Sequence, residues 1–394
     1  AGAATTGAGG AAAAAPQPTE CPPGMTATCY AGQVDNGAYY SIAIPADWNG
    51  DLVMHAHGGP GLGAPTPQRS ADDLARWSVM VREGYAWAGS SYRRGGYGAR
   101  MAVADTEALR RLFVATYGQP RRTFAHGQSW GGNVAAKLVE TYRSGYDAAL
   151  ITNGIVSGTG YQSAPADRTP GQQRNLDDIL GVTRVPERTL FSHLRFATFT
   201  FRDIVSDRLG GRNPFSNSDV RYTGSHDDKA LNAGVERFAA DPSAVRDLSY
   251  DSDLTGAVSI PVLTLHAIED PTVFVEHESA YRATRAGAGT GDGLVQLFTR
   301  ENEHSVLSQS EYASAITALA GWVETGRKPT PASVSASCPE FDQVYGTGCF
   351  FDPGYVPGSY ESRVYPRSGA RHWPAMTAAQ AEAWSHIDGV GIAP

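Results

Sequence analysis

The chain has 394 residues, of which 41% are hydrophobic, and it carries a formal net charge of −8. This length and hydrophobic content allow a sizeable core, and large α/β folds of this size often stay in one piece. The negative charge argues against partners such as nucleic acid or anionic membrane surfaces. No apolar run approaches the length of a membrane span, and the sequence predicts no oligomeric state.

The first segment is an Ala/Gly tract that extends to Ala15 and is followed by Pro16-Gln17-Pro18. Glycine breaks the helix that alanine would otherwise favour. We therefore expect residues 1–20 to be a flexible leader. A first residue other than methionine and this composition are typical of a mature N-terminus after signal cleavage, although a remnant of cloning would look the same.

Residues 38–155 alternate between short apolar runs and helical periodicity, which predicts an α/β fold with a mostly parallel sheet covered on both faces. The expected strands are Tyr39–Ile44, Leu52–Ala56, Tyr85–Ser90, Arg122–Ala125 and Leu150–Asn153, and the expected helices are Ala71–Glu83 and Met101–Tyr117.

A glycine-rich turn, residues 57–61 (His-Gly-Gly-Pro-Gly), follows the strand that ends at Ala56. Acyl transfer places negative charge on the substrate carbonyl oxygen, which needs two backbone N–H donors already in position. We expect Gly59 to supply one of them; the alternative is an ordinary tight turn. His55 and His57 share one face of the strand and could suggest a metal site, but no further ligand stands nearby, so we expect structural histidines and no metal.

A second motif, residues 127–131 (Gly-Gln-Ser-Trp-Gly), fits the G-x-S-x-G pattern of a nucleophile elbow, between a short strand and a helix over residues 133–142. Ser129 would be the nucleophile, and the N–H of Trp130 would be the second oxyanion donor. In a chain with 45 glycines this motif alone is equally compatible with a plain loop.

Two loops downstream supply an acid and a base. The apolar strand Ile260–Ala267 ends just before Glu269 and Asp270, and His304 follows the strand Leu294–Phe298. Open α/β sheets carry their chemistry in loops at the carboxyl ends of strands. We expect His304 to be the general base and Asp270 to orient it, with Glu269 as the competing acid.

The four cysteines form two local pairs in the sequence, Cys21 with Cys29 and Cys338 with Cys349. Proximity favours these pairings among the three that are possible. Two disulfides predict an oxidising compartment, so the protein is expected to be secreted or periplasmic. The alternative is four free thiols in a cytosolic enzyme, whereas the spacing does not fit a zinc site.

Together these motifs resemble the α/β-hydrolase superfamily, over roughly residues 37–328 and in the chain order of nucleophile, acid and histidine. The resemblance implies the α/β-hydrolase fold, with helices on both faces of a mostly parallel sheet and an inserted, mainly helical lid. It implies neither a metal nor an organic cofactor.

Two narrower resemblances point to different substrates. The glycine-rich turn together with Gly-x-Ser-Trp-Gly-Gly is similar to proline iminopeptidase-type enzymes. Those enzymes carry an Asp-x-Arg-Gly turn where this chain has Tyr92 in place of the aspartate. The segments Gly37–Tyr40 and Ile44–Gly50 are more similar to secreted bacterial hydrolases of esterase type.

These features predict five regions. After the leader, residues 21–156 and 260–330 form two parts of the hydrolase core. Residues 157–259, polar, helical and broken by Gly and Pro, form the lid. Residues 331–394 form an extension pinned by a disulfide. Four phenylalanines of the lid could line an acyl or aryl site or form the lid's own core: Phe191, Phe196, Phe199 and Phe201.

The predicted function is that of a secreted bacterial serine hydrolase that cleaves carboxylic esters, in small molecules or polymers. An aminopeptidase of proline iminopeptidase type is the first alternative, and it would need lid carboxylates to hold the substrate ammonium group. The candidates are Asp177, Asp178, Glu187, Asp203, Asp227 and Asp228. A non-catalytic binding module on the same fold is the second alternative.

Overall fold

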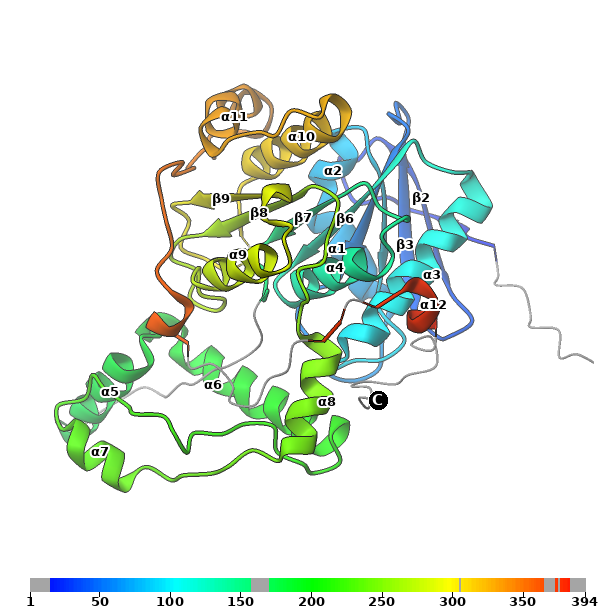
Figure 1. Cartoon of the computed structure of the whole chain (residues 1–394). Coiled ribbons are helices and arrows are strands. Elements are labelled where there is room, and N and C mark those ends of the chain that lie inside the picture. Colours follow the sequence, from blue (N-terminus) through cyan, green and yellow to red (C-terminus); the bar gives the residue numbers. More distant parts are fainter. Residues whose placement is uncertain (1–14, 157–169, 305, 365–372, 375, 383–394) are drawn as a thin grey trace, which may run out of the picture.

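A computed structural model describes residues 15–156, 170–304, 306–364, 373–374 and 376–382 (Figure 1). Its centre is a nine-stranded sheet with the order β1-β2-β3-β5-β4-β6-β7-β8-β9. Strands β1 to β3 pair antiparallel, and the six strands β4 to β9 run parallel. The strands are β1 Gln17–Thr19, β2 Ala27–Gln33, β3 Tyr39–Pro45, β4 Asp51–Ala56, β5 Ala86–Ser90, β6 Arg122–Gln128, β7 Ala148–Thr152, β8 Val262–Ala267 and β9 Leu294–Thr299.

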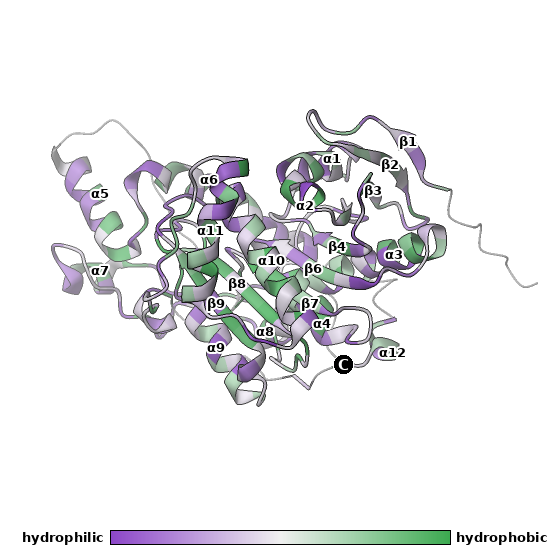
Figure 2. Cartoon of the chain, turned by 90° about the horizontal axis from the view of Figure 1, so that it is seen from above, coloured by the Kyte–Doolittle hydropathy of each residue, from purple (hydrophilic) through white to green (hydrophobic). Residues whose placement is uncertain are grey.

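Helices cover both faces of the sheet, as the sequence predicts for parallel strands buried on both sides. Every residue of β4 and β8 is buried, and β8 is mainly hydrophobic when seen from above (Figure 2). One face packs against α3 (Ala99–Tyr117), α4 (Trp130–Thr141), α8 (Pro242–Ser252) and α9 (His277–Gly287). The other packs against α1 (Pro67–Arg76), α2 (Ser78–Arg82), α10 (Gln309–Thr325) and α11 (Pro331–Tyr345).

The structure differs from the sequence prediction at two places in the first part of the core. The single helix expected over 71–83 is two helices, because Trp77 has non-helical dihedrals (φ −103°, ψ 29°). Residues 17–19, assigned above to the leader, form the edge strand β1. Its residues are all exposed, so it lacks the apolar alternation that reveals a strand in sequence.

The segment between β7 and β8, called the helical insertion here, contains α5 (Pro170–Thr183), α6 (Glu187–Arg202), the π-helical turn η1 (Asp203–Arg208), α7 (Asp228–Gly234) and α8. Residues 157–169 of the expected lid lie outside the described residues. Figure 1 shows α5 and α7 well away from the sheet. Ala244 and Leu248 of α8, by contrast, belong to the same core cluster as α3 and α4.

The C-terminal extension begins with α11, a helix that the sequence analysis did not predict. Both expected disulfides are present, Cys21–Cys29 and Cys338–Cys349. Further along, a short 3₁₀ turn, η3 (Tyr360–Ser362), packs on α9, and α12 (Ala378–Ala381) follows. Within the described residues, no helix is both long and apolar enough to cross a membrane.

Candidate active site

Ser129 lies in the sharp turn between β6 and α4. Its φ of 59° and ψ of −125° are strained for a residue with a side chain. A Cβ at Gly127 would stand 2.0 Å from the Gly131 carbonyl oxygen, and one at Gly131 would stand 2.1 Å from the Ala56 carbonyl oxygen. Only glycine fits at these two positions, so the residue spacing of the motif follows from the tightness of the turn.

The structure brings together the three residues selected from the sequence. His304 Nε2 lies 2.9 Å from Ser129 Oγ, and His304 Nδ1 lies 2.8 Å from Asp270 Oδ2. The Asp270 side chain is fully buried, while Glu269 is exposed, which decides between the two acids. The other Asp270 oxygen accepts N–H bonds from Thr272 and Val273, at 2.8 and 2.9 Å, so both carboxylate oxygens are held in place.

The two expected oxyanion donors line the same pocket as Ser129, called the serine pocket here, which has a volume of about 400 Å³. Trp130 is the first residue of α4, so its N–H has no acceptor within the helix. Gly59 has a φ of +81°, a conformation that favours glycine. The positive end of the α4 dipole also favours negative charge at this point.

Two contacts that the sequence analysis did not predict hold the glycine-rich turn. The Tyr92 hydroxyl donates to the His57 carbonyl oxygen at 3.0 Å, and His57 Nδ1 lies 2.5 Å from Asp73 Oδ2. Burial raises the pKa of Tyr92 well above its ordinary value, so the hydroxyl stays a donor. Tyr92 itself has a positive φ of 58°. The residue that departs from the peptidase-like motif thus fixes the turn before Gly59.

The aspartate of this pair is ionised within a cluster of histidines. Burial would raise the pKa of Asp73, but His57 and His55 together lower it by more, so the net shift is downward. His55 Nδ1 lies 2.9 Å from His126 Nδ1, and burial lowers the pKa of both rings. His55 therefore lies between His126 and Asp73, with its Nε2 3.4 Å from Asp73 Oδ2, an arrangement that fits the structural interpretation of these histidines.

One group of potential metal ligands lies within mutual reach in the part of the chain that the structure describes: Cys338, Asp342 and Cys349. The two cysteines are joined in a disulfide, so neither offers a thiolate. This group does not fit a metal ion while the disulfide is intact.

The six carboxylates considered for an ammonium site lie elsewhere. None of them lines the serine pocket among the described residues. Asp178 contacts His226 at 2.5 Å, and Asp203 pairs with Arg208 at 3.1 Å. Asp227 caps α7. These contacts account for three of the six carboxylates without a substrate ammonium group.

The four phenylalanines divide between two cavities and the surface. Phe196 lines the serine pocket, and Phe201 lines a neighbouring cavity. Phe191 and Phe199 are exposed, at 64% and 50%. Neither alternative, one substrate wall or one lid core, therefore describes all four residues.

Comparisons with known proteins place the fold. No family model matches the chain. Over 122 residues it is 26% identical to o-phthalyl amidase from Xanthobacter agilis, a match that spans 30% of this chain and only a quarter of the length of that protein. Among solved structures, Candida antarctica lipase A superposes with a TM-score of 0.51 at 13% identity, covering 84% of this chain and 87% of the lipase. An esterase from Aspergillus oryzae reaches 0.46 at 12% identity, over 77% and 81%.

The topology and the likeness to the lipase show that the chain has the α/β-hydrolase fold, which confirms the predicted fold class. On this fold, a serine in a strand-to-helix turn contacts a histidine that contacts a buried aspartate. Fold and contacts together thus have the geometry of a serine-histidine-aspartate triad on an α/β-hydrolase fold.

Proposed function

We propose that the protein is a serine esterase that cleaves carboxylic esters through Ser129, His304 and Asp270. The observation that carries the proposal is the unbroken contact from serine to histidine to buried aspartate, at 2.9 and 2.8 Å. These are hydrogen-bond distances, and the serine stands on a turn that exposes its hydroxyl to the serine pocket.

Each residue has a defined step in the proposed reaction. Ser129 Oγ attacks the ester carbonyl carbon, and His304 Nε2 takes the hydroxyl proton. The N–H groups of Trp130 and Gly59 donate to the carbonyl oxygen as it becomes negative. His304 then passes its proton to the departing alcohol, which leaves an acyl-enzyme. A water molecule, deprotonated by His304, attacks the acyl carbon. His304 then returns the proton to Ser129 Oγ as the carboxylic acid leaves, and Asp270 stabilises the imidazolium in both halves.

The serine pocket favours an ester over a peptide with a free N-terminus. The carboxylate that lines it within the described part of the chain is Asp73, which is engaged by His57 at 2.5 Å. Arg76 lines the same pocket, and a cation there disfavours an ammonium group. Amide cleavage is the second candidate, since a distant relative is called an amidase.

A fluorophosphonate probe tests the nucleophile. We expect wild type to be labelled at Ser129, and Ser129→Ala to lose both labelling and at least about a thousandfold in kcat for 4-nitrophenyl acetate. Ser192→Ala is the matched control, because Ser192 lines the same pocket from α6. A folded wild-type protein that is not labelled would favour the binding-module alternative.

Comparing 4-nitrophenyl esters with the corresponding acyl 4-nitroanilides and with aminoacyl anilides separates the bond types. The proposal expects the largest kcat/KM for the esters. Faster cleavage of acyl anilides would make the protein an amidase, and faster cleavage of aminoacyl anilides an aminopeptidase.

Secretion is part of the proposal and rests on the two disulfides, which are typical of extracellular and periplasmic proteins. Mass spectrometry of protein taken from its native compartment should show both bonds. Four free thiols there would contradict a secreted or periplasmic location.

A further inference from the structure

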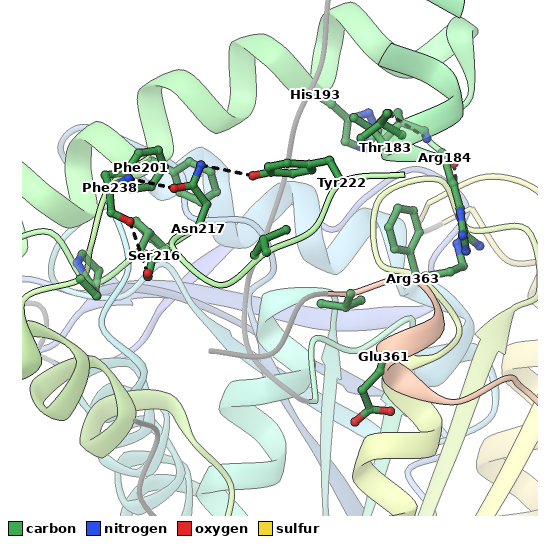
Figure 3. Close-up of a pocket in the computed structure, with 18 of the residues that line it drawn as sticks. Thr183, Arg184, His193, Phe201, Ser216, Asn217, Tyr222, Phe238, Glu361 and Arg363 are labelled. Atoms are coloured by element: carbon green, nitrogen blue, oxygen red, sulfur yellow. Dashed lines mark hydrogen bonds between the residues drawn. The ribbon is translucent and has the colours of Figure 1, made fainter. Parts of the chain in front are cut away.

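A second cavity, called the insertion cavity here, adjoins the serine pocket and has a volume of about 710 Å³. Its walls come from the helical insertion, the loop after Asp270 and residues 361–364 of the extension (Figure 3). His193 of α6 lines both cavities, and its Nε2 lies 3.1 Å from Thr272 Oγ1. Thr272 lines the serine pocket and the preceding residue, Pro271, lines the insertion cavity, so the two cavities share a wall.

Aromatic rings form much of the wall of the insertion cavity. The rings are Phe201, Phe215, Tyr222, Phe238 and Phe274. Two of them, Phe201 and Phe215, are in contact, with centroids 4.8 Å apart. Figure 3 shows Phe201 and Phe238 at one end of the cavity, Arg184 and Arg363 at the other, and Tyr222 between them. Such a wall favours a planar apolar group over a polar one.

The charge of the wall is positive, although the chain as a whole is acidic. Four arginines line the cavity, Arg184, Arg202, Arg221 and Arg363, against one carboxylate, Glu361, which is exposed. Cations along a partly enclosed wall raise the local concentration of an anionic ligand.

Arg363 is the arginine best placed to hold an anion. Its guanidinium carbon lies 3.9 Å from the centroid of the Phe274 ring, and its Nη2 donates to the Arg184 carbonyl oxygen at 3.3 Å. Its Nη1 forms a long ion pair with Glu276 at 3.7 Å, a separation beyond hydrogen-bond distance. The Nε atom of Arg363 is buried and has no hydrogen-bond partner among the described residues. A buried donor without an acceptor is costly, and a ligand carboxylate would satisfy it.

We propose that the insertion cavity binds the part of the substrate remote from the scissile bond, and that this part is an aromatic group bearing a carboxylate held by Arg363. The proposal rests on the proposed function, because it assigns the substrate class of the same site. It also gives residues 361–364 of the extension a role, since they close the cavity beside the insertion. Arg184 Nη1 contacts the Ser362 carbonyl oxygen and ties the two segments together.

Direct binding tests the cavity separately from catalysis. Calorimetric titration of wild type and Ser129→Ala with 4-phenylbutanoate and with neutral 4-phenylbutanamide should show at least tenfold tighter binding of the carboxylate to both proteins. Arg363→Gln should remove this preference. The matched control is Arg195→Gln, which removes an exposed charge from α6 outside the cavity and should keep the preference.

Steady-state kinetics with a small ester show whether each variant is folded and active. Turnover of 4-nitrophenyl acetate, which is small enough for the serine pocket alone, should be unchanged in Arg363→Gln. If that variant does not fold, Arg202→Gln, an exposed arginine of the same wall, should reduce the preference about threefold. If wild type does not hydrolyse 4-nitrophenyl acetate, the proposed function is wrong, but the binding measurements still test the cavity.

Three binding results would overturn the cavity proposal. The first is equal affinity for acid and amide, or no binding of either probe to folded protein. The second is a preference that survives Arg363→Gln in a variant with wild-type acetate turnover. The third is an equal loss in Arg195→Gln, which would attribute the preference to overall charge.

Discussion

The Tyr92 hydroxyl is a single oxygen on which the glycine-rich turn depends. It donates to the His57 carbonyl oxygen at 3.0 Å from a side chain that is only 2% exposed. A Cβ added to Gly131 would lie 2.8 Å from that same carbonyl oxygen, so the nucleophile elbow closes off one side of it. The Tyr92→Phe substitution therefore leaves a part-buried carbonyl oxygen without its donor.

The size of the effect follows from where the lost donor acts. An unsatisfied buried acceptor costs about 1–3 kcal/mol. If the turn keeps its position, the free energy of unfolding falls by that amount. If the turn moves, the Gly59 N–H leaves the oxyanion, and complete loss of one such donor costs about 3–4 kcal/mol in the transition state. We expect both in part: stability lower by about 1–2 kcal/mol, and kcat lower by about tenfold.

The assays are urea unfolding with the disulfides intact and steady-state hydrolysis of 4-nitrophenyl acetate. KM should change little, because the carbonyl oxygen gains its charge in the transition state and not on binding. Tyr40→Phe is the matched control: its hydroxyl is buried over Gly32 and has no hydrogen-bond partner among the described residues. If Tyr92→Phe matched Tyr40→Phe in both stability and kcat, the Tyr92 hydroxyl would not be holding the glycine-rich turn.

Three further outcomes are expected. Burial raises the pKa of Glu311 to about 7, above the unfolded value, so the folded state holds an extra proton and stability is lost as pH rises from about 4.5 to 7. In urea unfolding, Glu311→Gln should therefore be about 3 kcal/mol more stable than wild type at pH 8 and equal to it at pH 4. Removing the disulfide by the double substitution Cys338→Ala and Cys349→Ala should lower the free energy of unfolding by about 3 kcal/mol. The folded variant should keep its acetate turnover, and a Tm equal to that of wild type would contradict the predicted loss of stability. Gly131→Ala places a Cβ 2.1 Å from the Ala56 carbonyl oxygen, so it should abolish fluorophosphonate labelling or folding, and normal labelling would show that the turn can open.

The parts of the structure that sequence predicted well are those whose signal is local. The strands before Ser129 and Asp270 are short and almost entirely buried, and each runs into the expected loop. The G-x-S-x-G spacing is dictated by two contacts too close for a side chain, at Gly127 and Gly131. Local sequence therefore placed the serine, the acid and the histidine in loops at the carboxyl ends of the parallel strands.

The parts that sequence missed depend on contacts between distant residues or on weak local patterns. Strand β1 is three exposed residues at the edge of the sheet, with no alternation to detect. Sequence favoured Asp270 over Glu269 only weakly, because the burial that separates the two side chains comes from the fold. Nothing near Tyr92 indicates that its hydroxyl bonds to a residue 35 positions earlier in the chain.

The insertion cavity, too, could not be predicted from local sequence. It also separates the proposed choice of substrate from the proposed bond-breaking step. Its aromatic and cationic lining comes from residues as far apart as Arg184 and Arg363, and 179 positions separate the atoms of their shared hydrogen bond. The bond-breaking step, by contrast, depends on turn geometry at Gly59 and Ser129 in the core. Changes in the insertion cavity should therefore alter which esters are accepted while acetate turnover stays constant, whereas changes in the two turns should lower turnover of every ester alike.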